Sequence, residues 1–264
     1  MSTRALLAEA VRPFGPGGQL LAKHIVPFNT FADALGVPPD DPIVAANDSP
    51  PKIGLELDDF REVATRIGCQ PAQIYAVWQV ESGGGWFRDV RKKILELDGP
   101  GGFIDGPHLP KILFEAHKFH KYTNGRFTKS HPNLSSRRWN RKLYIGGQGE
   151  WARLHAAMKL DRRAALMSAS VGGGQIMGFN YKLAGYNSVE EFWTAQKTSE
   201  REHLEAFANF IINSRLGRAL RQVSRRHADC KAIAKGYNGS GYWMHKPGYH
   251  IRIARAYDKA VPLF

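Results

Sequence analysis

Apolar side chains recur at intervals of three and four residues through most of the chain after residue 56, with polar side chains between them. That spacing places the apolar residues on one face of an α-helix, so it predicts a mainly α fold. Helices are expected over residues 58–67, 71–81, 109–122, 150–158, 162–169, 188–196, 199–214, 228–235 and 249–261. Asp58, Ser188 and Ser199 are suitable N-caps, and glutamates three places after the two serines complete capping boxes.

The pattern changes between residues 83 and 110, where glycines separate short apolar pieces. Short apolar pieces bounded by glycine are typical of small hairpins. We therefore expect a β-hairpin or loop lobe directly after the helix that ends at Glu81.

The start of the chain differs from the rest in composition. Residues 1–56 hold 8 of the 15 prolines, so long regular elements are not expected there. We interpret residues 1–56 as an N-terminal extension of unknown role and residues 57–264 as the main domain. A chain of 264 residues is long enough to bury a substantial core.

Several classes of protein are disfavoured by composition. An apolar stretch of 18 residues and a signal peptide are both missing from the sequence, so neither a transmembrane segment nor ordinary export is expected. Cys69 and Cys230 lack the spacing of a metal site and are expected to be buried thiols. No metal or cofactor is implied, and we expect a monomer.

Charge is distributed unevenly along the chain. Residues 1–58 carry 4 Lys and Arg against 7 Asp and Glu, whereas residues 59–264 carry 33 against 17. Such a basic part attracts polyanions, of which a bacterial envelope surface is one and nucleic acid another. Because helix-turn-helix, zinc-finger and single-strand-binding signatures are missing, we expect no specific nucleic-acid partner. The alternative is a solvated surface without a partner.

Glu81 ends the apolar face of the helix expected over residues 71–81. Ile74, Val77, Trp78 and Glu81 stand at i, i+3, i+4 and i+7, so all four share one face. A carboxyl group held against apolar side chains has a raised pKa, which suits the general acid of glycoside hydrolysis. The alternative is an exposed glutamate at a helix end.

Glu115 is a second candidate acid. It lies in the helix expected over residues 109–122, where Ile112 and Phe119 share its side. Two inward carboxylates across a cleft would suit paired acid chemistry. Alternatively, Glu115 pairs with His117 or another nearby cation.

Asp105 and His117 are further candidates. Asp105 is a possible third acid, with a turn before Gly106 as its alternative role. His117 and His120 stand at i and i+3 without a matching acidic or cysteine partner, so they do not indicate a metal site. We retain His117 as a candidate substrate contact.

Two glycine-rich segments, 168–178 and 234–243, carry side chains that suit carbohydrate binding. These candidates are Ser170, Gln175, Tyr237 and Asn238. Aromatic stacking and amide hydrogen bonds hold sugars in many proteins, although the second segment also suits a helix C-cap. The glycines at 172–174 do not form a nucleotide loop, because the phosphate-binding spacings are missing.

The order of short motifs over residues 57–261 is more specific than any one of them. They are Val80-Glu-Ser-Gly-Gly84, Phe103-Ile-Asp-Gly106, Lys111-Ile-Leu-Phe-Glu-Ala-His-Lys-Phe-His120, Gly149-Glu-Trp-Ala-Arg-Leu154, Gly174-Gln-Ile-Met-Gly-Phe-Asn-Tyr181, Ala184-Gly-Tyr186 and Gly236-Tyr-Asn-Gly239. Together they resemble the N-acetylmuramidase family of phage endolysins, within the lysozyme-like superfamily. The resemblance implies a lysozyme-like helical fold in a catalytic domain over residues 57–264.

The same resemblance implies an activity. It is cleavage of the β-1,4 bond between N-acetylmuramic acid and N-acetylglucosamine in peptidoglycan glycan strands, with Glu81 as catalytic acid and Glu115 also involved. It further implies a phage or prophage origin. Without a signal peptide, the chain is expected in the host cytoplasm before its release to the periplasm and cell wall.

Two departures from the family pattern stand out. Residues 86–101 enlarge the loop after the Glu-Ser-Gly motif, and Ser170-Val171-Gly172 replaces a Ser-Trp-Gly whose tryptophan would suit a sugar platform. Three alternatives stay open. They are a lytic transglycosylase that leaves anhydromuramic ends, a wall-binding but inactive relative, and, more remotely, a basic nucleic-acid-binding protein.

Overall fold

The computed structural model describes residues 54–81, 85–87, 90–98, 102–104, 108–244 and 246–264. The chain divides into two units, Met1–Lys52 and Ile53–Phe264, of which the first lies outside the described residues. The expected N-terminal extension therefore lies outside the described residues except for its last three positions.

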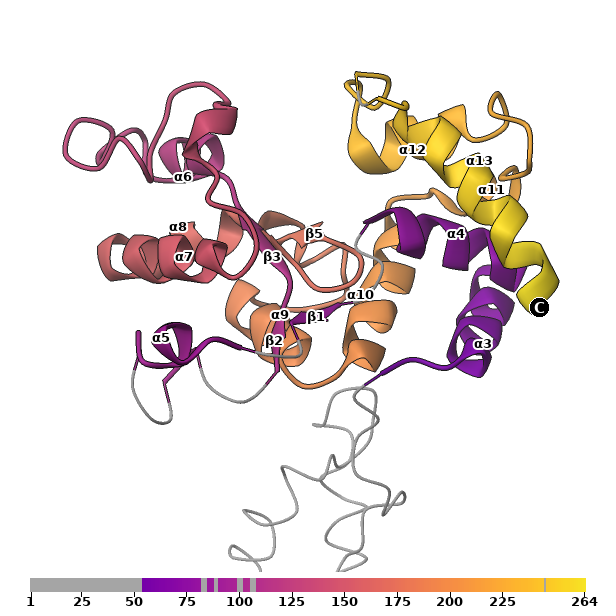
Figure 1. The fold of residues 1–264 in the computed structure, drawn as a ribbon, viewed down its shortest axis with the longest axis horizontal. Helices are drawn as coiled ribbons and strands as arrows, with labels where there is room; N and C mark the ends of the chain where they lie inside the picture. Colours follow the sequence, from indigo (N-terminus) through magenta and orange to yellow (C-terminus); the bar gives the residue numbers. More distant parts are fainter. Residues whose placement is uncertain (1–53, 82–84, 88–89, 99–101, 105–107, 245) are drawn as a thin grey trace, which may run out of the picture. The chain divides into compact units, whose positions relative to one another are not determined.

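The second unit is mainly α-helical, as the periodicity predicts (Figure 1). Its described helices are α3 (Leu57–Ile67), α4 (Pro71–Glu81), α5 (Lys92–Leu95), α6 (Ala116–Tyr122), α7 (Gly149–Leu160), α8 (Arg162–Met167), α9 (Val189–Gln196), α10 (Glu200–Asn213), α11 (Gly217–Arg221), α12 (Lys231–Asn238) and α13 (Tyr249–Ala260). Short 3-10 turns are η3 (Arg141–Leu143), η4 (Gly178–Asn180) and η5 (Val261–Leu263).

Helix starts follow the capping chemistry in two of the three expected cases. The hydroxyl groups of Ser188 and Ser199 accept hydrogen bonds from the backbone N–H groups three residues later, as predicted. The prediction for Asp58 is wrong, because α3 begins at Leu57 and Glu56 is its N-cap. Glu56 and Asp59 there form a reciprocal capping box, which satisfies the first free N–H groups of the helix.

Two small antiparallel sheets accompany the helices. β1 (Trp86–Phe87) pairs with β2 (Leu109–Pro110), which confirms a hairpin lobe after Glu81. A second sheet has the order β3 (Ile112–Phe114), β4 (Ala169–Val171) and β5 (Ile176–Met177). Leu113 lies opposite Ser170, and Ser170 lies opposite Met177.

The helix expected over residues 109–122 is wrong in its first half. The apolar run that looked helical is strand β3, and only residues 116–122 are helical. Apolar residues on every face of the run reflect burial of Ile112 and Phe114 in a sheet rather than a helix, a distinction that periodicity alone does not make. Glu115 therefore lies at a strand-to-helix junction.

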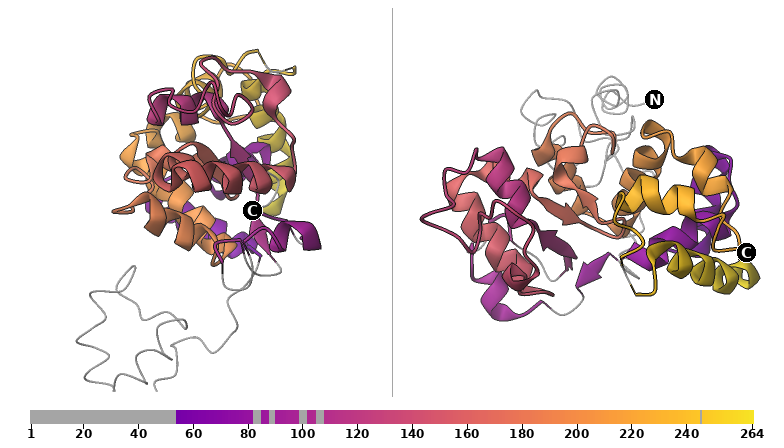
Figure 2. Two further views of the ribbon diagram at one scale, coloured as in Figure 1. Left: turned by 90° about the vertical axis from the view of Figure 1, so that its left-hand side faces the viewer. Right: turned by 90° about the horizontal axis from the view of Figure 1, so that it is seen from above.

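Helices gather in two groups with the three-stranded sheet between them (Figures 1 and 2). In one group α13 packs along α4, and α3, α11 and α12 adjoin them. In the other group α7 packs against α8 and β3, and α6 contacts α8. α10 contacts α3, α9 contacts both α8 and α10, and together they connect the two groups.

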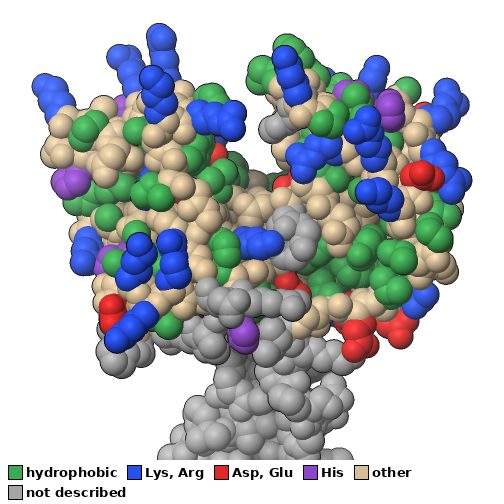
Figure 3. Space-filling view, viewed as in Figure 1, with side chains coloured by type: hydrophobic (Ala, Val, Ile, Leu, Met, Phe, Trp, Pro, Cys, Tyr) green, Lys and Arg blue, Asp and Glu red, His purple; other side chains and the backbone are tan. Residues whose placement is uncertain are grey.

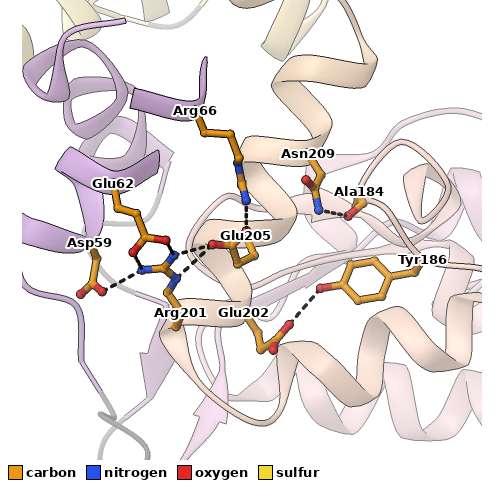
Figure 4. A network of polar contacts seen from close by, with 9 residues as sticks. All are labelled: Asp59, Glu62, Arg66, Ala184, Tyr186, Arg201, Glu202, Glu205 and Asn209. Atoms are coloured by element: carbon orange, nitrogen blue, oxygen red, sulfur yellow. Dashed lines mark hydrogen bonds and ion pairs between the residues drawn. The ribbon is translucent and has the colours of Figure 1, made fainter. Parts of the chain in front are cut away.

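Arg201 on α10 joins that helix to α3 (Figure 4). Its guanidinium donates to both carboxylate oxygens of Glu62, at 2.8 and 2.7 Å, and to Asp59 at 3.1 Å. It also donates to Glu205 one turn along its own helix, and Arg66 binds the other oxygen of Glu205 at 2.6 Å. Bidentate pairing fixes the relative orientation of the two helices more tightly than a single contact would.

The described residues 90–98 of the enlarged loop include α5, which contacts α7. Its described helix α5 lies below α7 and α8 in Figure 1, whereas α6 lies above them. Ile94 is buried in the core, and Arg91 donates a backbone hydrogen bond of 2.8 Å to the side chain of Gln148. The extra residues that the structure describes therefore add α5 to the helix group of α6, α7 and α8.

In the described ranges, none of the helices combines the length and apolarity that crossing a bilayer requires.

Candidate active site

Glu81 ends α4 with its carboxyl group half-buried. Ile74, Val77 and Trp78 on the same face are at most 2% exposed, so the predicted apolar setting is present. Tyr249 at the start of α13 donates its hydroxyl hydrogen bond to Oε1 of Glu81. Arg252, one turn later, donates to the carbonyl oxygen of Val80 at 2.8 Å and brings its positive charge close to the carboxyl group.

Burial raises the pKa of Glu81 to about 7, although the Tyr249 hydrogen bond and the Arg252 charge act in the opposite direction. A substantial share of the molecules therefore carries a proton on this carboxyl group at neutral pH. That is the protonation state a general acid needs.

Gly172, Gly173 and Gly174 form the turn that joins β4 to β5 beside α4. A Cβ atom on Gly173 would lie 2.0 Å from the buried indole of Trp78, so the close approach requires glycine. Gly172 has a φ of +77°, which also favours glycine. The glycine run thus allows the protein to pack against itself, rather than serving only to admit a ligand.

Tyr237 on α12 completes this side of the site. Its hydroxyl donates to the carbonyl oxygen of Gly174 at 2.5 Å. Burial raises the pKa of Tyr237, and the charge of Glu81 raises it further, which places this phenol within electrostatic reach of the acid.

Gln175 and Ser170 bind one another within the β4–β5 turn. The Ser170 hydroxyl donates to Oε1 of Gln175 at 3.0 Å, and Nε2 of Gln175 donates to the carbonyl oxygens of Lys111 and Gly172 at 3.1 and 2.9 Å. Gln175 also has a left-handed backbone, with φ of 48°. These bonds hold the turn in place and engage both ends of the amide with protein.

Glu115 follows β3 in an extended conformation and is the N-cap of α6. Its side chain is 15% exposed. Tyr144 donates to Oε2 of Glu115 at 2.5 Å, and Nδ1 of His117 lies 3.1 Å from the same oxygen. Alternation along the strand places Glu115 on the same face of the sheet as Leu113 and its cross-strand partner Ser170.

His117 is neutral at neutral pH in this setting. Burial lowers its pKa, and the neighbouring Glu115 only partly opposes that effect. A neutral imidazole that binds the carboxylate through Nδ1 must carry its proton on that nitrogen. The alternative role foreseen for Glu115, pairing with His117, is therefore realised as a hydrogen bond.

A buried ion pair holds the backbone next to Glu115. Glu150 and Arg153 on α7 are 0% and 4% exposed and lie 2.7 Å apart. The N–H of Phe114 donates to Glu150 at 3.2 Å, and Arg153 donates to the carbonyl oxygen of Phe114 at 2.9 Å. Glu150 also accepts from the backbone of Ile145 at 2.8 Å, so one pair fixes both Glu115 and the loop that carries Tyr144.

A hollow separates the two helix groups on the face shown in Figure 3. The three-stranded sheet lies between the two groups, and α4, which ends at Glu81, belongs to one of them (Figure 1). The helices flanking the hollow carry many Lys and Arg side chains (Figure 3). In the ranges that the structure describes, no cluster of three or more His, Cys, Asp or Glu residues is arranged to hold a metal ion.

The family model for N-acetylmuramidases matches residues 70–261. The chain belongs to the N-acetylmuramidase family. The resemblance drawn from the ordered motifs is thereby confirmed, and with it the class of enzyme, a glycosidase that degrades peptidoglycan.

Comparison with solved structures supports the same fold. The chain is similar to the structure titled "Crystal structure of Burkholderia AP3 phage endolysin", with 28% identity and a TM-score of 0.62. That likeness covers 97% of this chain and 86% of the other. A comparison with curated proteins finds no match.

Position 171 is one place where this N-acetylmuramidase departs from the family pattern. Val171 in β4 is fully buried and faces the core, opposite Ile112 and Ile176. The loss of an aromatic sugar platform at this position stays a prediction.

The structure brings most of the predicted site residues of this N-acetylmuramidase into two clusters. Glu81 and Tyr237 lie on one side, and Glu115 and His117 on the other, with Ser170 and Gln175 bracing the turn between them. Asn238 is exposed at the end of α12. Asp105 lies outside the described residues.

Tyr249 and Tyr144 were not foreseen as site residues. For Tyr249 a signal was present, because it stands at i and i+4 with Ile253 on the apolar face of the expected helix 249–261. Tyr144 lies between an exposed basic loop and a pair of glycines, where periodicity gives no indication of burial.

Proposed function

We propose that this chain cleaves the β-1,4 bond between N-acetylmuramic acid and N-acetylglucosamine, with Glu81 as the general acid. The observation that carries the proposal is the half-buried Glu81 carboxyl group, whose pKa burial raises to about 7. A protonated carboxyl at the end of α4 can donate to the glycosidic oxygen as the bond breaks.

Glu115 is the second carboxylate of the proposed mechanism. Tyr144 and His117 both bind its Oε2, and among the described residues Oε1 has no hydrogen-bond partner. A carboxylate oxygen that stays open can stabilise the positive charge on the sugar ring or deprotonate a water molecule. These two roles give retained and inverted anomeric configurations respectively, which NMR of the fresh reducing ends distinguishes.

Substrate contacts form the rest of the proposed site. We assign positioning of the glycan to Tyr237 and Asn238 on α12, and to Ser170 and Gln175 through the turn they stabilise. His117 contributes by orienting Glu115. Asp105 stays a candidate third acid.

Digestion of purified peptidoglycan with mass analysis of the products tests this function. Hydrolysis adds one water to each cleaved bond, whereas a transglycosylase leaves anhydromuramic ends. Glu81→Gln should lower the rate roughly 100- to 10,000-fold while the protein stays folded. Glu115→Gln should also lower it strongly; wild-type rates in the first variant would refute the assignment of Glu81, and in the second that of Glu115.

The biological setting is part of the proposal. Similarity to a structure whose title names a phage endolysin supports a phage or prophage origin and a role in releasing phage from the host. We propose that the protein accumulates in the host cytoplasm and reaches the wall once the inner membrane is opened. Residues 1–56 are proposed as an extension separate from the catalytic domain over residues 57–264.

A further inference from the structure

The loop between α6 and α7 presents a tryptophan among four cations. We call residues 137–142 the Trp139 loop. All six of its side chains are exposed, and Trp139 is 60% exposed. The cations of the loop are Arg137, Arg138, Arg141 and Lys142.

Both ends of the Trp139 loop are tied to the folded unit. Before it, the N–H of Ser136 donates to the carbonyl oxygen of Ala116 at 3.1 Å. Within it, the side chain of Asn140 caps η3 by accepting from the N–H of Lys142 at 3.0 Å. After it, the N–H of Gly146 donates to buried Glu150 at 2.9 Å. The loop is thus held at a defined position rather than hanging free.

The loop is also connected to the proposed catalytic carboxylate. The rings of Trp139 and Tyr144 pack with centroids 6.3 Å apart at an angle of 50°. Tyr144 then donates its hydroxyl to Glu115 at 2.5 Å. An exposed indole therefore stands two contacts away from Glu115, on the same side of the site.

Within the described ranges, no carboxylate lies within ion-pair distance of Arg137, Arg138, Arg141 or Lys142. Four clustered positive charges repel one another, and an anion placed between them would stabilise them. An aromatic face with cations around it suits a sugar that bears carboxylates.

We propose that the Trp139 loop is a subsite for the peptide-bearing glycan strand, in which Trp139 stacks on a sugar ring and the cations bind carboxylates of the peptide stems. The inference rests on the proposed function, because it takes peptidoglycan as the substrate. Peptide stems of peptidoglycan are attached to N-acetylmuramic acid and carry free carboxylates. These carboxylates match the positive charge of the loop, and the sugar ring matches the flat face of Trp139. The contact through Tyr144 favours this occupant over nucleic acid, since it joins the loop to Glu115.

Two variants of the full chain separate the parts of the subsite. One is Trp139→Ala. The other replaces Arg137, Arg138, Arg141 and Lys142 together by Gln. A matched control replaces four exposed cations outside the loop, Lys92, Lys93, Arg255 and Lys259, by Gln, so that net charge falls equally.

Two substrates then report on the two kinds of contact. Intact peptidoglycan carries peptide stems, and the same glycan treated with an amidase that removes the stems does not. The quadruple loop variant should raise KM roughly tenfold on intact peptidoglycan, with kcat unchanged, and should match wild type on stripped strands. Trp139→Ala should raise KM on both substrates. The control variant should change KM by no more than about twofold on either substrate.

Binding is measured beside turnover by co-sedimentation with insoluble peptidoglycan. Equal KM and equal binding for the loop variants and wild type would overturn the subsite. So would a loss of DNA binding without any change on peptidoglycan, which would assign the loop to nucleic acid. If wild type released no reducing ends, the proposed function would fail, and the co-sedimentation comparison would still decide the subsite.

Discussion

At the scale of single residues, the proton on Glu81 depends on a balance between burial and two polar neighbours. Burial raises the pKa of the carboxyl group to about 7, while the Tyr249 hydroxyl and the Arg252 charge lower it. Activity that requires a protonated Glu81 should therefore fall as pH rises through about 7.

Tyr249→Phe removes one of the effects that lower this pKa. The basic limb of kcat/KM should move to higher pH in the variant, because Glu81 then keeps its proton longer. Profiles of both proteins between about pH 5 and about pH 9 measure the shift. Tyr257→Phe is a matched control, since it removes a phenol on the same helix whose partner is Gln70. A limb that stayed in place in Tyr249→Phe, or moved to lower pH, would contradict this account of Glu81.

Local sequence indicates Glu81 but not its partner. Glu81 follows Ile74, Val77 and Trp78 on one helix face, so a stretch of eight residues contains the signal. Tyr249 lies 168 positions further along the chain, and only the packing of α13 on α4 brings it to the carboxyl group. Acids can be predicted from such local patterns, whereas the groups that tune them depend on tertiary structure.

At the scale of elements, the turn between β4 and β5 is positioned by close packing on α4. Gly173→Ala would place a Cβ atom 2.0 Å from the indole of Trp78, which is 2% exposed and has little room to move. We expect a loss of about 2 kcal/mol or more in the free energy of unfolding, together with lower activity, because the turn must shift.

Urea unfolding measures the effect, and Gly217→Ala is the control. A Cβ atom on Gly217 would meet only the flexible end of Arg221 at 3.4 Å and Ile67 at 3.9 Å. Alanine at this helical position should raise the free energy of unfolding slightly. Equal stability of Gly173→Ala and wild type would show that the turn is not held by Trp78.

The elements themselves were predictable where they are long and amphipathic. α4 has the predicted bounds, and α9 and α10 begin after the predicted serine caps. The strand β3 was not predictable, because Ile112–Phe114 is too short to show a period and its partner Ala169–Val171 is more than fifty residues away. The structure places Glu115 at the N-cap of α6 rather than in the middle of a helix.

At the scale of the whole unit, the titration of Glu81 and of His203 makes the free energy of unfolding depend on pH, with opposite signs for the two groups. Burial raises the pKa of Glu81 from its ordinary 4.5 to about 7, so its contribution is present below about pH 4.5 and is lost as pH rises through about 7. Burial lowers the pKa of His203 from 6.5 to about 4, so its contribution is present above about pH 6.5 and is lost as pH falls toward 4. Between these limits the two trends oppose each other.

The Glu81→Gln variant should separate the pH dependence contributed by Glu81 from that contributed by His203. The difference in free energy of unfolding between this variant and wild type cancels the groups they share, so it isolates Glu81. We expect the free energy of unfolding of the variant to rise relative to wild type by about 3 kcal/mol as pH rises from about 4.5 to about 7, with a constant difference outside that window. A difference that did not change with pH would mean that folding does not raise the pKa of Glu81.

Tryptophan fluorescence during urea unfolding reports this quantity for the catalytic unit, because all six tryptophans lie beyond residue 56. In Glu81→Gln itself, stability should fall more steeply than in wild type as the solution is acidified from about pH 6.5. The reason is that the opposing contribution of Glu81 is missing in the variant, whereas burial still disfavours a protonated His203. A protonated His203 also could not accept the N–H of Gly173, which lies 3.2 Å from its Nδ1. Gly173 is also the residue that packs on Trp78, so acid should loosen the turn that packs on α4.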